Sequence, residues 1–161
     1  MLRYAESLLR TKILGFPLHQ FPSIKDLCFA TVSKFSCLSL VSSERGLGAG
    51  AIERPVEAQY QDEFYRACYN MLNGKVHLTS EWAGRLYKGR VDFQIKPINW
   101  AIECVREGNR LEEHIKRFLQ GGRYYRWILS GEIQEYIILD FRKSKPRKVR
   151  GIVIYFLFFS A

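Results

Sequence analysis

Residues 90–106 alternate apolar and polar side chains with a period of two, interrupted once by turn-forming residues at 96–99. Such alternation is typical of strands with one buried face, and the interruption predicts two antiparallel strands joined by a short loop. Pairing Ile95 with Trp100 puts the apolar residues of both strands on one face. They are Val91, Phe93, Ile95, Trp100, Ile102 and Cys104. A shift of one residue would expose this face, so the hydrophobic pattern fixes the register.

The same register places Asp92 opposite Glu103 on the second face of the hairpin. Two carboxylates about 5 Å apart repel by about 3 kcal/mol at an effective dielectric constant of about 20. Water offsets this repulsion on an exposed face, a proton on one carboxyl removes it, and a divalent cation shared by both converts it into affinity. Two interpretations therefore stand: a solvated hairpin face or a metal site.

Helical spacing of apolar residues predicts a long helix from residue 56, which Asn73 and Gly74 close. Glu63 borders its apolar stripe, either as an ionic partner of Arg66 or as a functional carboxylate. Residues 75–80 predict a strand between this helix and the hairpin.

After the hairpin, Asn109 is the expected N-cap of a second helix. His114 faces the apolar side of that helix, as a core histidine or as a phosphate contact. Residues 124–129 and 133–141 are rich in aromatic and β-branched side chains and predict two further strands.

The chain is expected to divide into four parts. Residues 1–41 form a helical segment with Ser23 as an N-cap, residues 42–55 a linker of Gly, Ser and Pro, and residues 56–142 the main domain. Residues 143–161 combine a basic patch with an apolar strand or tail.

The chain has 25 Lys and Arg against 16 Asp and Glu, a net charge of +9, which favours polyanions as partners. The basic patch is expected either to contact nucleic acid or to be a solvated tail. Its residues are Lys143, Lys145, Arg147, Lys148 and Arg150. The longest apolar run, residues 152–159, is far shorter than the ~20 residues of a membrane span, so no membrane partner is expected.

Several phrases in order resemble a known nuclease family. They read EAQYQDEFYR at 57–66, GRVDFQI at 89–95, WAIECVREG at 100–108, RLEEH at 110–114 and ILDF at 138–141. Together they resemble the C-terminal domains of Crinkler-type effector proteins, in the PD-(D/E)XK superfamily. The resemblance implies an α/β (α+β) fold: a restriction-endonuclease-like α-β-β-β-α-β core with a central mixed sheet, preceded by the N-terminal helical segment.

The resemblance also implies a function, the hydrolysis of DNA phosphodiester bonds with Mg²⁺ or Mn²⁺. Asp92 and Glu103 would hold the metal and Glu63 would assist. The lysine that the family places two residues after the Glu is Val105 here. Arg90, the cross-strand partner of Val105, is the expected electrostatic substitute.

Because the lysine is missing, a second hypothesis is an inactive effector domain that binds nucleic acid or a host protein. The resemblance implies secretion and a host nucleus; otherwise an intracellular, nuclear protein is expected. Residues 1–20 contain no continuous apolar run of the kind found in secretory signals.

Overall fold

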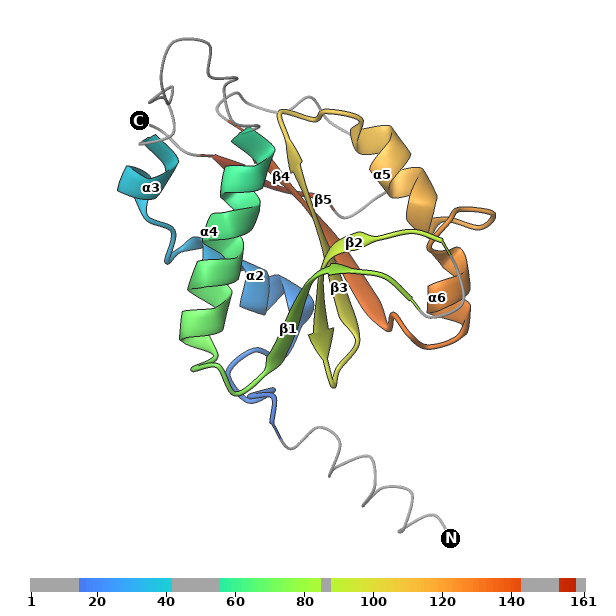
Figure 1. The fold of residues 1–161 in the computed structure, drawn as a ribbon, viewed down its shortest axis with the longest axis horizontal. Helices are drawn as coiled ribbons and strands as arrows, with labels where there is room; N and C mark the ends of the chain where they lie inside the picture. Colours follow the sequence, from blue (N-terminus) through green and yellow to red (C-terminus); the bar gives the residue numbers. More distant parts are fainter. Residues whose placement is uncertain (1–14, 42–55, 85–87, 143–153, 159–161) are drawn as a thin grey trace, which may run out of the picture.

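The structure is a computed structural model that describes residues 15–41, 56–84, 88–142 and 154–158 of the 161-residue chain. Within them, five strands form one sheet flanked by helices (Figure 1). The strands are β1 (His77–Trp82), β2 (Val91–Lys96), β3 (Trp100–Arg106), β4 (Glu135–Arg142) and β5 (Ile154–Phe158). The helices are α2 (Ile24–Val32), α3 (Cys37–Val41), α4 (Val56–Met71), α5 (Leu111–Phe118) and α6 (Tyr125–Leu129).

Two predicted features lie outside the described residues. They are the linker at 42–55 and the basic residues Lys143, Lys145, Arg147, Lys148 and Arg150.

The sheet is mixed. β1, β2 and β3 pair antiparallel in chain order, whereas β4 pairs parallel to β3 and β5 pairs parallel to β4. A parallel neighbour requires a crossover connection, and α5 and α6 supply it between β3 and β4. The predicted mixed α/β fold with a central mixed sheet is confirmed, and the apolar C-terminal residues contain a strand of that sheet.

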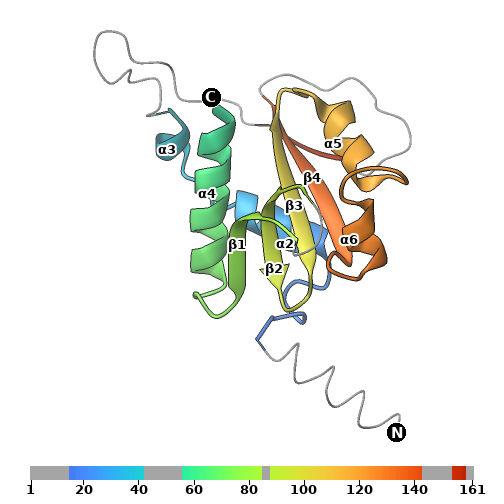
Figure 2. The same cartoon turned by 45° about the vertical axis from the view of Figure 1, so that its right-hand side comes forward.

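Helices cover both faces of the sheet and make three layers (Figure 2). On one face, α2 and α4 pack on alternate strand residues, which include Phe93, Ile102 and Leu139. On the other face, α5 and α6 pack on Ala101 and Val105 of β3. Residues 100–105 of β3 are all buried, as expected for a strand covered on both sides.

The long helix α4 ends as predicted. Asn73 and Gly74 have positive φ angles of 52° and 64°, and the Gly74 N–H donates to the carbonyl of Tyr69 at 3.0 Å. This left-handed ending satisfies a carbonyl of the last helical turn and turns the chain toward β1.

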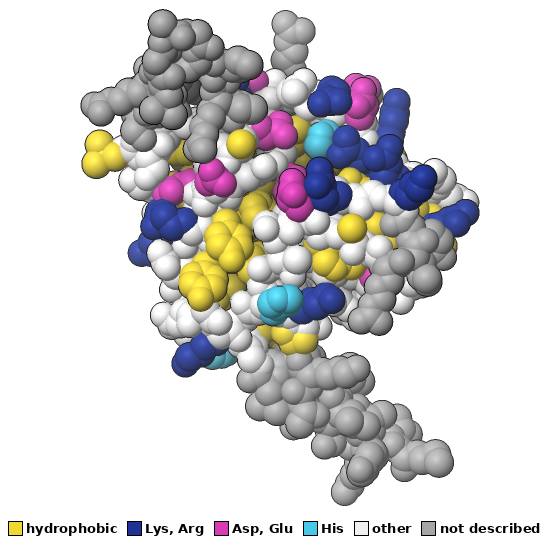
Figure 3. All heavy atoms as spheres, viewed as in Figure 1, with side chains coloured by type: hydrophobic (Ala, Val, Ile, Leu, Met, Phe, Trp, Pro, Cys, Tyr) yellow, Lys and Arg dark blue, Asp and Glu magenta, His cyan; other side chains and the backbone are white. Residues whose placement is uncertain are grey.

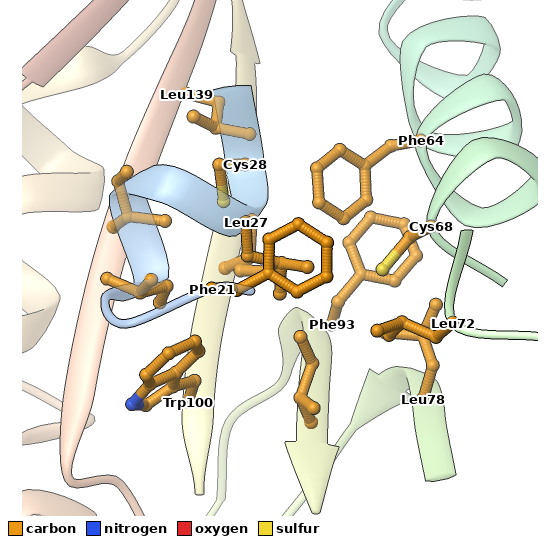
Figure 4. Close-up of a cluster of buried hydrophobic side chains, with 14 of the residues drawn as sticks. Phe21, Leu27, Cys28, Phe64, Cys68, Leu72, Leu78, Phe93, Trp100 and Leu139 are labelled. Atoms are coloured by element: carbon orange, nitrogen blue, oxygen red, sulfur yellow. The ribbon is translucent and has the colours of Figure 1, made fainter. Parts of the chain in front are cut away.

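The segment that precedes the predicted linker belongs to the hydrophobic core. The Ser23 hydroxyl accepts the Asp26 N–H at 3.2 Å, which confirms the predicted N-cap of α2. Leu27 and Cys28 of α2 are fully buried among side chains of α4 and the sheet (Figure 4).

Aromatic rings extend this packing along the segment. The ring centroids of Phe16 and Trp100 are 5.2 Å apart, and those of Phe35 and Phe141 are 5.8 Å apart. The N-terminal segment therefore completes one face of the sheet.

Two local predictions are wrong. Residues 124–129, predicted as a strand, contain helix α6, because a helical turn buries both Tyr124 and Trp127, whose rings stack 4.9 Å apart. Their aromatic content indicated a strand, but packing against the sheet decides the local structure. The N-cap of α5 is Arg110 and not Asn109, and no side chain hydrogen-bonds to this helix start.

No helix in the described part of the chain is long and apolar enough to cross a bilayer.

We predict that Leu27→Ala lowers the free energy of unfolding by about 2–5 kcal/mol, because it leaves a cavity where α2 meets the sheet. Leu38→Ala, at a side chain that is 82% exposed, is the matched control and should change it by less than about 0.5 kcal/mol. Urea unfolding measures both. Equally small effects would show that α2 does not contribute to the core.

Candidate functional site

The hairpin of β2 and β3 has the predicted register. Phe93 pairs with Ile102, Gln94 with Ala101 and Ile95 with Trp100. The pairing of β2 with β3 ends at Phe93. Asp92, one position before Phe93, accepts the Cys104 N–H with Oδ2 at 2.7 Å. A side-chain carboxylate thus bonds to the backbone of β3 where the ladder of paired residues ends. The predicted cross-strand pairing of Asp92 with Glu103 is therefore wrong: Asp92 lines a pocket with residues of α4, whereas Glu103 bonds to α5 on the other side of the sheet.

This ending of the ladder also changes the predicted apolar face. Five of its six members pack with α2 and α4, but Val91 packs on the opposite side, in the cluster that contains α5 and α6. The prediction for Val91 is wrong because strict alternation holds only while β2 stays paired with β3.

Glu103 lies beneath α5. It is 1% exposed, and its Oε2 accepts the Nδ1–H of His114 at 2.6 Å. Arg117 Nη1 lies 3.5 Å from the same oxygen. The second oxygen, Oε1, is buried and has no hydrogen-bond partner among the described residues. Oε2 therefore has partners on α5, whereas Oε1 has no donor among the described residues.

Asp92 shows the repulsion expected of paired acids. Burial, and next the charge of Glu103, raise its pKa from 3.8 to about 7. The Cys104 N–H acts in the opposite direction, and the charge of Glu57 raises the pKa further. At neutral pH this carboxyl is thus balanced between its charged and neutral forms.

Glu63 does not bond to Asp92 or Glu103; its carboxylate has Arg66 and Ser36 as partners. Arg66 Nε donates to its Oε2 at 2.9 Å, and the Ser36 N–H and a second Arg66 nitrogen donate to Oε1. These bonds lower the pKa of Glu63, with the Arg66 hydrogen bond as the largest cause. Of the two interpretations of Glu63, the ionic partner of Arg66 describes what is seen.

Arg90 is also placed differently from the prediction. Its guanidinium donates to Glu81 at 3.1 Å and both side chains are largely exposed, while its carbonyl accepts the Tyr124 hydroxyl. The residue precedes β2, beyond the last recorded pair with β3, so the expected position beside Glu103 is wrong. Arg117 occupies that position instead.

His114 is buried at 8% exposure and serves as the partner of Glu103. The core-histidine interpretation fits this arrangement better than a direct phosphate contact. Val105 of β3, at the position where the resemblance implies a lysine, is fully buried in the cluster that contains residues of α5.

A pocket of about 350 Å³ opens beside Asp92, between α4 and the hairpin of β1 and β2. Its lining is made of Gln61, Asp62, Tyr65, Ser80, Glu81, Asp92 and Phe93. Of the two central acids, Asp92 faces this opening and Glu103 does not line it.

The donor set favours a hard cation over a soft one, since its atoms are carboxylate oxygens. Within the described ranges, no three His, Cys, Asp or Glu side chains are grouped closely enough to hold a metal ion. The two carboxylates that this part of the chain offers a hard cation are Asp92, whose pKa is raised by its neighbour, and Glu103, whose Oε1 has no hydrogen-bond partner among the described residues.

Sequence reasoning gave no role to Glu57 and Arg117. Glu57 lies six residues before Glu63, so the two are about 120° apart around α4, and only Glu57 acts on the pKa of Asp92. Arg117 follows His114 by three positions, a spacing that puts both on one side of α5. In the sequence, this three-residue spacing is the feature that could have indicated a position for Arg117 beside His114.

Comparisons with known proteins identify no relative: no family model, no curated protein and no solved structure matches this chain.

We predict that Asp92→Asn stabilises the protein at pH 8 and has a clearly smaller effect at pH 5. With a raised pKa, folded Asp92 holds its proton more tightly than the unfolded chain does, so stability falls as the pH rises from about 4 to about 7. The neutral amide removes this loss, and each kcal/mol regained raises the melting temperature by about 2–4 °C. Calorimetry at the two pH values measures it.

Asp62→Asn is the matched control for this experiment, because Asp62 is an exposed acid of the same pocket. It should leave the difference between pH 5 and pH 8 unchanged. Parallel pH dependence in wild type and Asp92→Asn would contradict the electrostatic description of the pair.

We predict that Arg66→Ala lowers the free energy of unfolding by about 1–3 kcal/mol, because it leaves the buried Glu63 carboxylate short of donors. Since the pKa of Glu63 is lowered, the contribution is present above its ordinary value of 4.5 and is lost as the pH falls below it. Adding Glu63→Gln should recover part of the loss at pH 7. Denaturant titration at pH 7 and pH 4 tests this, and an undiminished loss in the double variant would contradict it.

Proposed function

We propose that this protein is a nuclease that hydrolyses DNA phosphodiester bonds with Mg²⁺ or Mn²⁺. The observation that carries the proposal is the pair Asp92 and Glu103, two largely buried acids close enough for one to raise the pKa of the other. Acids whose pKa is strongly shifted by burial and by a neighbouring charge are typical of functional sites. A pocket beside Asp92 gives a substrate access to it.

The arrangement of elements supports the same proposal. Helix α4 precedes three antiparallel strands, and a helical crossover leads to a parallel fourth strand. The resemblance implies a core of the order α-β-β-β-α-β, and the agreement of this order with the observed elements supports the proposal. Asp92 and Glu103 lie on adjacent strands, β2 and β3, as that resemblance requires.

Asp92 and Glu103 would hold the metal, and Glu103 has an oxygen, Oε1, without a hydrogen-bond partner among the described residues. When bound, such an ion activates water and stabilises the charge that develops on the attacked phosphate. His114 and Arg117 orient Glu103 through its other oxygen. Arg117, with a side chain 24% exposed, keeps N–H groups that can donate to a phosphate oxygen. It thus takes over the role that sequence reasoning gave to Arg90.

A second candidate is a domain that binds nucleic acid without cutting it. The observation that favours it is Val105, which fills the family's lysine position with a fully buried apolar side chain. That strand position offers no cation to the reaction.

The test is a cleavage assay on supercoiled plasmid and on circular single-stranded DNA, with Mg²⁺, Mn²⁺ or EDTA. We predict metal-dependent cleavage that falls at least about 100-fold in Asp92→Asn and in Glu103→Gln, as expected for the loss of a metal's supporting groups. Arg117→Ala should lower the rate, and Arg90→Ala, on the exposed pair with Glu81, is the matched control that should not.

Binding of DNA without cleavage under any of these conditions would favour the second candidate. Cleavage that survives Asp92→Asn would exclude Asp92 from the site and with it the proposed mechanism.

A further inference from the structure

Two tyrosines stand on the solvent side of α4. Tyr65 and Tyr69 are 38% and 47% exposed, and their rings stack with centroids 6.0 Å apart and planes 13° apart. Four residues separate them, the spacing at which side chains of a helix meet. Each ring keeps part of its surface in solvent, so the pair presents aromatic surface to a partner.

Both rings are supported from below. The Tyr65 ring lies 6.5 Å from that of Phe93 on β2. A Cβ atom at Gly74 would lie 2.8 Å from the Tyr69 hydroxyl, so this turn fits around the ring only because residue 74 has no side chain. Rings held in this way lose little conformational entropy when they bind a partner.

The tyrosines adjoin the proposed active site. Tyr65 lines the same pocket as Asp92, and the other acids of that pocket, Asp62 and Glu81, are exposed. A phosphate is repelled by these carboxylates, whereas an uncharged ring is not. The charges therefore favour an uncharged planar group on the tyrosine side.

Cations gather on the opposite side of the acids. The exposed ones on and around α5 and α6 are Arg110, Lys116, Arg123 and Arg126, which outnumber the exposed acids Glu112 and Glu113 in the first turn of α5. Figure 3 shows Lys and Arg side chains over α5 and α6, hydrophobic side chains over α4 and β1, and acidic side chains between them. One face thus offers an aromatic surface, the acidic site and a basic surface in sequence.

We propose that the nucleic acid recognised at this site is single-stranded DNA, with an unpaired base stacked on Tyr65 or Tyr69 and the backbone directed toward α5 and α6. The proposal rests on the proposed function, since it adds the substrate to the site of Asp92. Aromatic rings beside a basic track are how proteins hold single strands without regard to sequence.

A duplex fits this face poorly for two reasons. Its bases are stacked on one another, so their faces are not available to the tyrosines. Its second backbone would also carry phosphates over the side of Asp62 and Glu81, where their charges repel. A single strand can place its bases on one side of the acids and its phosphates on the other.

The test uses fluorescence anisotropy in EDTA, which prevents metal-dependent cleavage. The probes are an oligothymidylate of about 12 nucleotides, an abasic chain of the same length and charge, and a duplex that contains the oligothymidylate. We predict that Tyr65→Ala and Tyr69→Ala each raise the Kd for oligothymidylate about tenfold and leave the Kd for the abasic chain unchanged. Wild type should bind the duplex about tenfold more weakly than the single strand.

Two sets of variants control for loss of structure. Tyr65→Phe and Tyr69→Phe keep the rings and should bind oligothymidylate as wild type does. Leu129→Ala, at an exposed side chain on α6, removes apolar surface outside the proposed path and should have no effect. Equal loss of affinity for the base-containing and the abasic chain, or a duplex bound as tightly as the single strand, would overturn the proposal.

The outcome is separable from that of the cleavage assay. Base-dependent binding by the tyrosines without any hydrolysis would support the single-stranded ligand and contradict the nuclease. Asp92-dependent cleavage of plasmid and single-stranded DNA alike, unaffected by the tyrosine variants, would support the nuclease and contradict the single-stranded substrate.

Discussion

The Asp92 carboxylate accepts a backbone N–H of β3 at the point where β2 and β3 stop pairing. This hydrogen bond holds a negative charge at the edge of the sheet interior, next to the buried Glu103. Both acids lie on strands of the sheet, so the fold keeps them close enough for the charge of Glu103 to raise the pKa of Asp92. A backbone N–H bonds to Asp92 and residues of α5 contact Glu103, and these interactions offset the repulsion between the two acids.

The negative charges of the two acids are compensated unequally, so the two sides of the site differ in charge. Glu103 is covered by His114 and Arg117, whereas Asp92 faces a pocket whose lining includes further carboxylates. The positive charge thus lies behind the pair and the opening lies in front of it. In the proposed function, a cation would enter from the Asp92 side and an anionic chain would approach from the basic side.

The hairpin, its register and helix α4 follow from the sequence because hydrophobic period and turn residues specify them locally. The sequence also indicates that Asp92 and Glu103 influence each other's charge, but not that they lie unpaired on adjacent strands. It does not indicate where β2 leaves β3, which moves Val91 and Arg90 away from their expected places. Nor does it distinguish a strand from a helix at Tyr124 and Trp127, since both are buried by packing from distant residues. The role of Arg117 likewise depends on how α5 sits on the sheet.

The N-terminal segment has a consequence for how the chain acquires its structure. Phe16 and Phe35, near the beginning, pack on Trp100 and Phe141, which are synthesised much later. During translation these early apolar side chains must wait, solvent-exposed, until most of the sheet has left the ribosome. Contacts so distant along the chain also carry a large loop-closure entropy, which slows folding relative to proteins of local topology. Phe16 and Phe35 therefore complete their packing only after β3 and β4 have been made, although Phe21 and Phe64 are nearer partners along the chain.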